Sequence, residues 1–298
     1  MHLPLFRIFL FLLTFSHAVS ATPPQVVVSI APIHAITSAV MRGIASPKLL
    51  IEARTSPHDF HLRPSQLIAL QSADLFIWVS PILEQGLAKV SARSSMQEKS
   101  LTLLEQAVIK KLKAREAGIW EDEKNHHNAQ VDPHIWLSPS NAIEIARIIT
   151  KRLSDIDSIN IVHYRENLAS FEQKVTMLEQ VINTEFNLKG MPSYLVLHDA
   201  FQYFEKYFKL PAAGAVSIDP EHSPGVRRIQ TLRNYIREHD IGCIFREPQL
   251  SDRMLNSISQ GLEIQTGILD PIGNEGDSYT QLIQSLSQQL RNCKTSAE

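Results

Sequence analysis

Short apolar runs alternate with amphipathic segments along most of the chain. Within a run, polar residues are few and do not alternate with apolar ones, and most runs end at Gly, Pro or Asp. Such runs are typical of strands buried on both faces of a sheet, and their alternation with helices predicts parallel strands in an α/β protein. The predicted strands lie within residues 25–32, 48–53, 75–81, 194–199, 212–218, 241–248 and 265–273.

Apolar residues at helical spacing predict helices between these runs. The predicted helices cover residues 63–74, 138–155, 227–240, 252–262 and 278–292. Residues 158–186 contain neither Gly nor Pro and keep the helical spacing throughout, so they predict one helix on the order of 40 Å long.

This long helix exceeds what either half of the chain needs for its own packing, and we interpret it as a rigid spine between two lobes. Each lobe is expected to be a mostly parallel sheet with flanking helices. The predicted division is an N-terminal lobe at 22–156, a linking helix at 157–187 and a C-terminal lobe at 188–298.

The first 21 residues differ from the rest of the chain. One positive charge precedes the apolar stretch at 8–15, and small residues follow at 19–21, which together predict a secretory signal peptide cleaved near Ala21. The apolar stretch is far shorter than the roughly 20 residues that span a bilayer. We therefore expect an exported, periplasmic protein without direct membrane insertion. No cysteine lies near the cleavage point, so a lipid-anchored amino terminus is not expected.

Charge and cysteine content narrow the function classes. The chain of 298 residues has 29 basic and 31 acidic residues and no long basic run, which argues against nucleic acid or an anionic membrane as a partner. In an oxidising compartment its two cysteines, Cys243 and Cys293, most simply form a disulfide that joins the last helix to a core strand. The alternative is two buried free thiols.

Four polar residues stand where ligands bind in α/β proteins. His58 follows the run at 48–53 in the loop "SPHDFHLRPS", His134 precedes a helix start, and His198 and Asp270 each end a predicted strand. Because ligands bind beyond the carboxyl ends of parallel strands, we expect these groups to converge in a cleft between the lobes. Imidazole nitrogens with one carboxylate suit Zn²⁺. Each residue alone is more often a hydrogen-bonded structural group, so the prediction depends on the four together.

Several stretches resemble the periplasmic solute-binding proteins of high-affinity zinc-uptake ABC transporters, the ZnuA-like family. They are "SPHDFHLRPSQLIALQSADLFIWVSPILE", "DPHIWLSPSNA", "YLVLHDAFQYFEKYF", "CIFREPQL" and "GILDPIG", and the likeness covers nearly all of the chain after the leader. The resemblance implies two lobes joined by a long helix, with zinc held in the cleft. It also implies a non-enzymatic carrier that is monomeric and delivers zinc to an inner-membrane permease and its ATPase.

The resemblance also implies roles for individual residues of this chain. It matches His58, His134 and His198 to the family's metal-binding histidines, and relatives that carry manganese have a glutamate where this chain has His198. Asp270 matches a position whose contribution varies within the family. The Cys243–Cys293 pair is similar to a disulfide of the family's second lobe.

Manganese or iron carriage remains an alternative, as does an exported zinc hydrolase, although the H-E-x-x-H signature of many zinc hydrolases is absent.

Two departures from the family pattern affect the site. Pro57 stands where some members have a glutamate ligand, so the fourth coordination position is expected to be filled by Asp270 or water. The acidic, histidine-rich loop of many members is reduced here to "EDEKNHHN", and we interpret His126 and His127 as part of a solvated surface loop with at most weak zinc binding.

Two expectations concern the surroundings of the site. His61 is expected to support His58 or to be exposed. Ligating imidazoles usually donate their second N–H to a carboxylate or a carbonyl, and the acidic neighbours of the predicted ligands in sequence are Asp59, Asp132 and Asp199.

Overall fold

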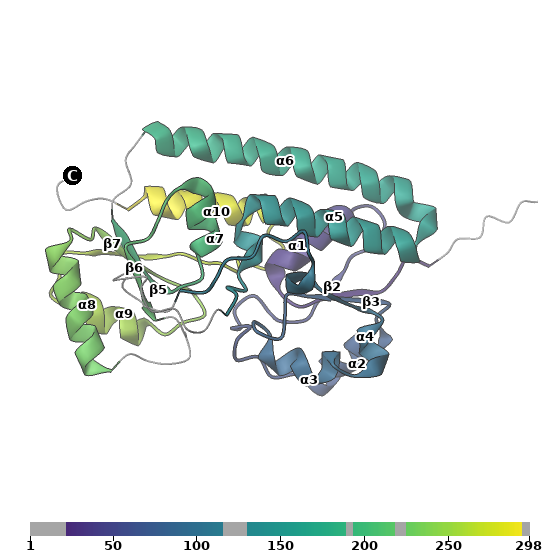
Figure 1. The fold of residues 1–298 in the computed structure, drawn as a ribbon, viewed down its shortest axis with the longest axis horizontal. Coiled ribbons are helices and arrows are strands. Elements are labelled where there is room, and N and C mark those ends of the chain that lie inside the picture. The colour runs from purple at the N-terminus through teal and green to yellow at the C-terminus, as the bar shows by residue number, and fades with distance from the viewer. Residues whose placement is uncertain (1–21, 116–129, 189–192, 218–224, 294–298) are drawn as a thin grey trace, which may run out of the picture.

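Two four-stranded parallel sheets form the centres of two lobes in a computed structural model, which describes residues 22–115, 130–188, 193–217 and 225–293 (Figure 1). The first sheet has the order β2-β1-β3-β4 and the second the order β6-β5-β7-β8, and every strand pair is parallel. The strands are β1 (Val26–Val28), β2 (Lys48–Leu49), β3 (Leu75–Trp78), β4 (Ser100–Thr102), β5 (Tyr194–His198), β6 (Gly214–Ser217), β7 (Cys243–Arg246) and β8 (Gln265–Ile268).

All the predicted strands are present, and the α/β prediction is confirmed. Strand β4 was not predicted, because it is three residues long and has a single buried side chain, that of Leu101. Strand β8 corrects the expectation of burial on both faces: it lies at the sheet edge, and three of its four residues are exposed.

The α-helices cover the sheets and connect the strands. They are α1 (Ala31–Val40), α2 (Pro64–Ser72), α3 (Ala88–Ser91), α4 (Ser94–Gln97), α5 (Pro139–Ile156), α6 (Ile161–Leu188), α7 (Gln202–Phe208), α8 (Val226–Glu238), α9 (Asp252–Ser259) and α10 (Tyr279–Arg291). All five predicted amphipathic helices are among them. Helices α1, α3, α4 and α7 were not predicted. Helix α1 begins two residues after β1 without a capping side chain, α3 and α4 are four residues long, and α7 is seven residues long.

The predicted spine is confirmed as α6, which a short 3-10 turn at Ser158–Asn160 precedes. Figure 1 shows α6 running along one side of the molecule over both lobes, with α5 and α10 beneath it. It packs against α1, α5 and α10. No helix in the described part of the chain combines the length and the apolar character needed to cross a membrane. The predicted signal peptide, residues 1–21, lies outside the described residues.

One hydrophobic core extends across both lobes. It includes Val27 of β1, Ile145 of α5, Phe204 of α7 and Leu286 of α10. A second, smaller core lies between the other face of the second sheet, α8 and α9, and includes Leu232 and Ile258. The lobes therefore share buried packing and are not independent bodies on a flexible linker.

The disulfide prediction is confirmed, since Cys243 at the start of β7 bonds Cys293, two residues beyond the end of α10. The bond attaches the terminal helix to a central strand of the second sheet. Helix α10 in turn contacts α1 and α6, so the disulfide anchors an element that packs against both lobes.

Candidate metal centre

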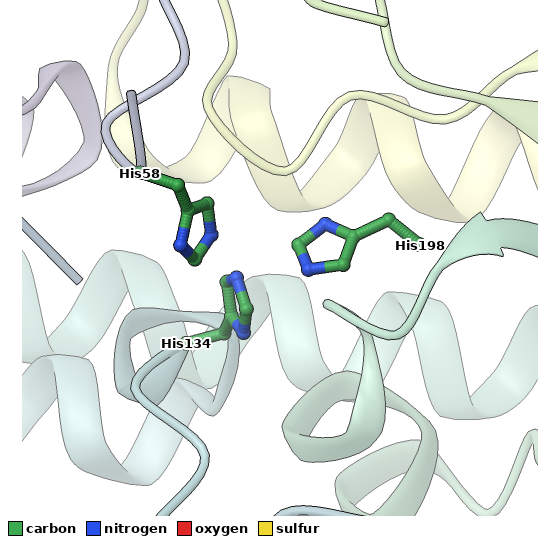
Figure 2. Close-up of side chains that lie close together, drawn as sticks. All are labelled: His58, His134 and His198. Atoms are coloured by element: carbon green, nitrogen blue, oxygen red, sulfur yellow. The ribbon is translucent and has the colours of Figure 1, made fainter. Parts of the chain in front are cut away.

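Three histidines from distant parts of the sequence meet between the lobes. His58 comes from the loop between β2 and α2, His134 from the segment just before α5, and His198 is the last residue of β5. Figure 2 shows their imidazole rings pointing toward one another. The ring centroids of His58 and His134 are 5.6 Å apart, those of His58 and His198 5.3 Å, and those of His134 and His198 5.0 Å.

The position of His198 follows from strand geometry. Alternate residues of a strand point to opposite faces, and Tyr194 and Val196 belong to the core shared by the lobes while Leu195 and Leu197 belong to the outer core. His198 therefore faces the first lobe, at the carboxyl end of a central strand.

Glu247 holds the His198 ring. Its Oε1 atom lies 2.8 Å from Nδ1 of His198, and both side chains are buried. This contact exists because β7 is the parallel neighbour of β5, so the residue after β7 lies beside the end of β5. With Nδ1–H donated to Glu247, the lone pair of Nε2 is left for a cation. Burial lowers the pKa of His198, but the carboxylates around it, Glu247 foremost, raise it by more.

Asp132 holds His134 in the same manner. Its Oδ1 atom accepts from the backbone N–H of His134 at 2.9 Å and lies 2.8 Å from its Nδ1. Burial, followed by the charge of nearby His198, lowers the pKa of His134 to about 3. His134 is therefore neutral at physiological pH, the state a metal ligand requires. Burial also raises the pKa of Asp132 to about 7.

His58 has a different setting, in a half-buried position within an irregular loop. The buried side chain of Phe60 anchors this loop two residues later. Beyond it α2 begins at Pro64 as expected, and the backbone N–H of Arg63 donates to Oε1 of Gln66 at 2.9 Å. The Gln66 amide also donates to the carbonyl of Leu50 at 2.7 Å, which ties the helix start to the end of β2.

His61 is not part of the cluster. Its side chain is 92% exposed and lies 3.7 Å from the carboxylate of Asp59, which is also exposed. This agrees with the expectation of an exposed residue. His126 and His127 lie outside the described residues.

Asp270 lies beside the cleft, outside the group of three histidines. Its Oδ1 atom accepts from the Gln249 side chain at 3.2 Å and from the backbone N–H of Ile272 at 3.0 Å. The next two residues, Pro271 and Ile272, line the cleft together with the histidines. Burial raises the pKa of Asp270. Its role as a metal ligand stays a prediction.

Of the acidic neighbours considered from the sequence, one holds a ligand. Asp132 contacts His134, whereas Asp199 pairs with Arg115 at 2.8 Å, in a cluster that also contains Glu205. Glu247 was missed, because it is 49 residues from His198 and the order of strands in the sheet is not readable from the runs alone.

The donor set suits a zinc ion. One ligand nitrogen from each histidine can be chosen so that all lie within 4.8 Å of one another. Tetrahedral zinc at about 2.0–2.1 Å from each nitrogen places those nitrogens roughly 3.4 Å apart. Small movements of the rings therefore bring the three nitrogens to a common ion, with one position left open.

Known proteins resemble the chain over almost its whole length. The family model described as "Zinc-uptake complex component A periplasmic" matches residues 26–293. The "High-affinity zinc uptake system protein ZnuA" of Brucella abortus is 31% identical over 303 residues, covering 90% of this chain and 91% of the relative. The protein of the same name from Yersinia pestis is 32% identical over 288 residues, covering 90% of each.

A solved structure supports the fold. The structure described as "Crystal structure of ZnuA" superposes with a TM-score of 0.77 at 21% identity, covering 92% of this chain and 100% of the other.

Proposed function

The chain belongs to the ZnuA family of periplasmic zinc-uptake components, and from this membership we propose that it captures Zn²⁺ in the periplasm and hands it to an inner-membrane ABC permease and its ATPase. Zinc is the cargo. The observation that carries the proposal is the convergence of three buried or half-buried histidines from distant segments in one cleft, within a chain that matches this family over residues 26–293.

We assign the cargo site to His58, His134 and His198, with Asp270 or a water molecule at the fourth position. The carboxylates that hold His134 and His198 support this assignment, because ligating histidines usually donate their second N–H to such a partner. Both arrangements leave Nε2 as the metal-facing atom.

Zinc is favoured over manganese or iron by the donor types. Three imidazole nitrogens suit a borderline-soft ion, whereas Mn²⁺ prefers carboxylate and carbonyl oxygens. The alternative of a manganese or iron carrier predicts the opposite order in a competition titration.

A carrier role is favoured over catalysis. A zinc hydrolase needs a general base free to take a proton from bound water. The carboxylates nearest the histidines, Asp132 and Glu247, are each already hydrogen-bonded to an imidazole nitrogen. We accordingly propose a non-enzymatic carrier. We also propose that it is exported and monomeric, with lobes at 22–156 and 188–298.

Metal analysis of the protein purified from the periplasm tests the proposal. We expect one zinc per chain and, in a competition titration, retention of zinc against an equal free concentration of manganese. Tighter retention of manganese would overturn the choice of metal. Unchanged zinc binding after all three histidines are replaced by alanine would overturn the site.

A further inference from the structure

The side chain of Gln249 crosses between the lobes at the metal cleft. Its Nε2 atom donates to the carbonyl of Ala53 at 2.9 Å, 196 positions away in the sequence, and to Oδ1 of Asp270 at 3.2 Å. Ala53 lies in the loop that carries His58, whereas Gln249 and Asp270 belong to the second lobe. Gln249 also lines the cleft together with the three histidines.

We propose that Gln249 is a positioning residue of the metal centre: it fastens the loop carrying His58 to the second lobe and so holds His58 within reach of the ion that His134 and His198 bind. The proposal rests on the function proposed above and adds to it a contact that limits how far the loop of His58 can move from the second lobe in the metal-free protein.

The orientation of the amide is fixed by its partners. A carbonyl oxygen and a carboxylate oxygen both accept hydrogen bonds, so the NH₂ end of the amide must face them. That choice leaves Oε1 of Gln249 buried and without a hydrogen-bond partner in the described part of the chain. A buried acceptor without a partner destabilises a fold.

One short turn, residues 247–250, contacts a ligand of the second lobe and the loop that carries a ligand of the first. Glu247 in this turn holds the His198 ring, and Gln249, two residues later, holds the loop of His58. The backbone N–H of Leu250 donates to the carbonyl of Glu247 at 3.1 Å, which closes the turn. Residues 247–250 therefore contact both the His198 ring and the loop that carries His58.

The Gln249→Met variant keeps the length of the side chain and removes its hydrogen bonds. In the metal-free protein we expect faster deuterium uptake at residues 50–58 and a melting temperature equal to or above that of the wild type. Zinc affinity should fall about tenfold, as for other partners outside the coordination sphere. Gln260→Met, at an exposed glutamine at the end of α9, is the matched control and should change none of these three quantities.

A double-mutant cycle with His58→Ala tests the route of the effect. If Gln249 acts through His58, adding Gln249→Met to His58→Ala should lower zinc affinity by less than about twofold. The inference is overturned by unchanged affinity in Gln249→Met, by the same tenfold loss in both backgrounds, or by a lowered melting temperature without faster exchange at 50–58. Weak zinc binding by the wild type, or none, would instead overturn the proposed function.

Discussion

His134 and His198, which we call the fixed pair, differ from the loop that carries His58, residues 52–62, in how the chain holds them. Each member of the fixed pair is at least 96% buried and has a carboxylate 2.8 Å from Nδ1. The loop has no helix or strand and exposes most of its polar side chains. The cleft thus combines a preformed pair of ligands with a third whose position depends on loop packing.

This difference indicates where the site adjusts to its cargo. The core shared by both lobes and the packing of α6 on α1, α5 and α10 resist a wide opening of the molecule. Capture and release are therefore expected to involve movement of the 52–62 loop more than movement of the fixed pair.

Removal of single ligands should give the largest effects. His134→Ala or His198→Ala should lower zinc affinity by more than about 100-fold, beyond the range for residues that merely support a ligand. Each change also leaves a buried carboxylate, Asp132 or Glu247, without its histidine. His58→Ala should cost less, because water can enter at its half-buried position. Competition titration with a chelator measures all three, and an equal or larger loss in His58→Ala would contradict the comparison.

The carboxylates behind the fixed pair come next. Asp132→Asn and Glu247→Gln should each lower zinc affinity about 10–100-fold, because the neutral amide holds the ring less strongly and stabilises the bound cation less. The same chelator titration checks this. Asp59→Asn, at an exposed carboxylate of the 52–62 loop, is the control, and a loss there as large as in Glu247→Gln would count against the assigned roles.

Packing beneath the 52–62 loop should have a smaller effect. A Cβ atom at Gly86 would overlap the carbonyl oxygen of Phe60 and lie 3.0 Å from its carbonyl carbon, so Gly86→Ala must push the loop. We expect about a tenfold loss of zinc affinity, at the low end of the range for supporting residues. Gly225→Ala is the matched control, since its added Cβ meets nothing within 4 Å. Wild-type affinity in Gly86→Ala would show that the loop tolerates displacement.

The smallest effect on zinc is expected at Glu84, which is buried away from the cleft. Its carboxyl group accepts from Ser29 Oγ and from the backbone N–H groups of Val79 and Ser80. Burial outweighs these bonds and raises its pKa from 4.5 to about 7. The folded protein therefore binds this proton more tightly than the unfolded chain does, and protonated Glu84 stabilises the fold. This contribution is complete below pH 4.5 and is lost as pH rises through 7, by about 3 kcal/mol in the free energy of unfolding.

Glu84→Gln should remove this part of the pH dependence while zinc affinity stays within about twofold of the wild type. Denaturant unfolding of the metal-free protein between pH 4.5 and 8 measures the first quantity. Glu98→Gln, at an exposed glutamate, serves as the control. If the free energy of unfolding of Glu84→Gln changed with pH as steeply as that of the wild type, the role given to this carboxyl group would be refuted.

The fold was largely readable from the sequence because its strands are short apolar runs that end in turn residues and its spine lacks helix breakers. Strand β4 and helix α7 were not predicted because each is too short to show a periodic pattern. His198 was found because it ends a predicted strand, whereas His58 and His134 were assigned mainly through the resemblance to the zinc-uptake family. Glu247 and Gln249 could not be found in this way, since their roles depend on which strands are neighbours and on contacts between lobes.

One zinc ion is expected to bind between His58, His134 and His198. A crystal structure of the zinc-loaded protein, with anomalous scattering measured at the zinc absorption edge, tests it most directly. We expect one fully occupied peak at about 2.0–2.1 Å from a ring nitrogen of each histidine. A principal peak elsewhere, or one that lacks contact with either member of the fixed pair, would contradict it.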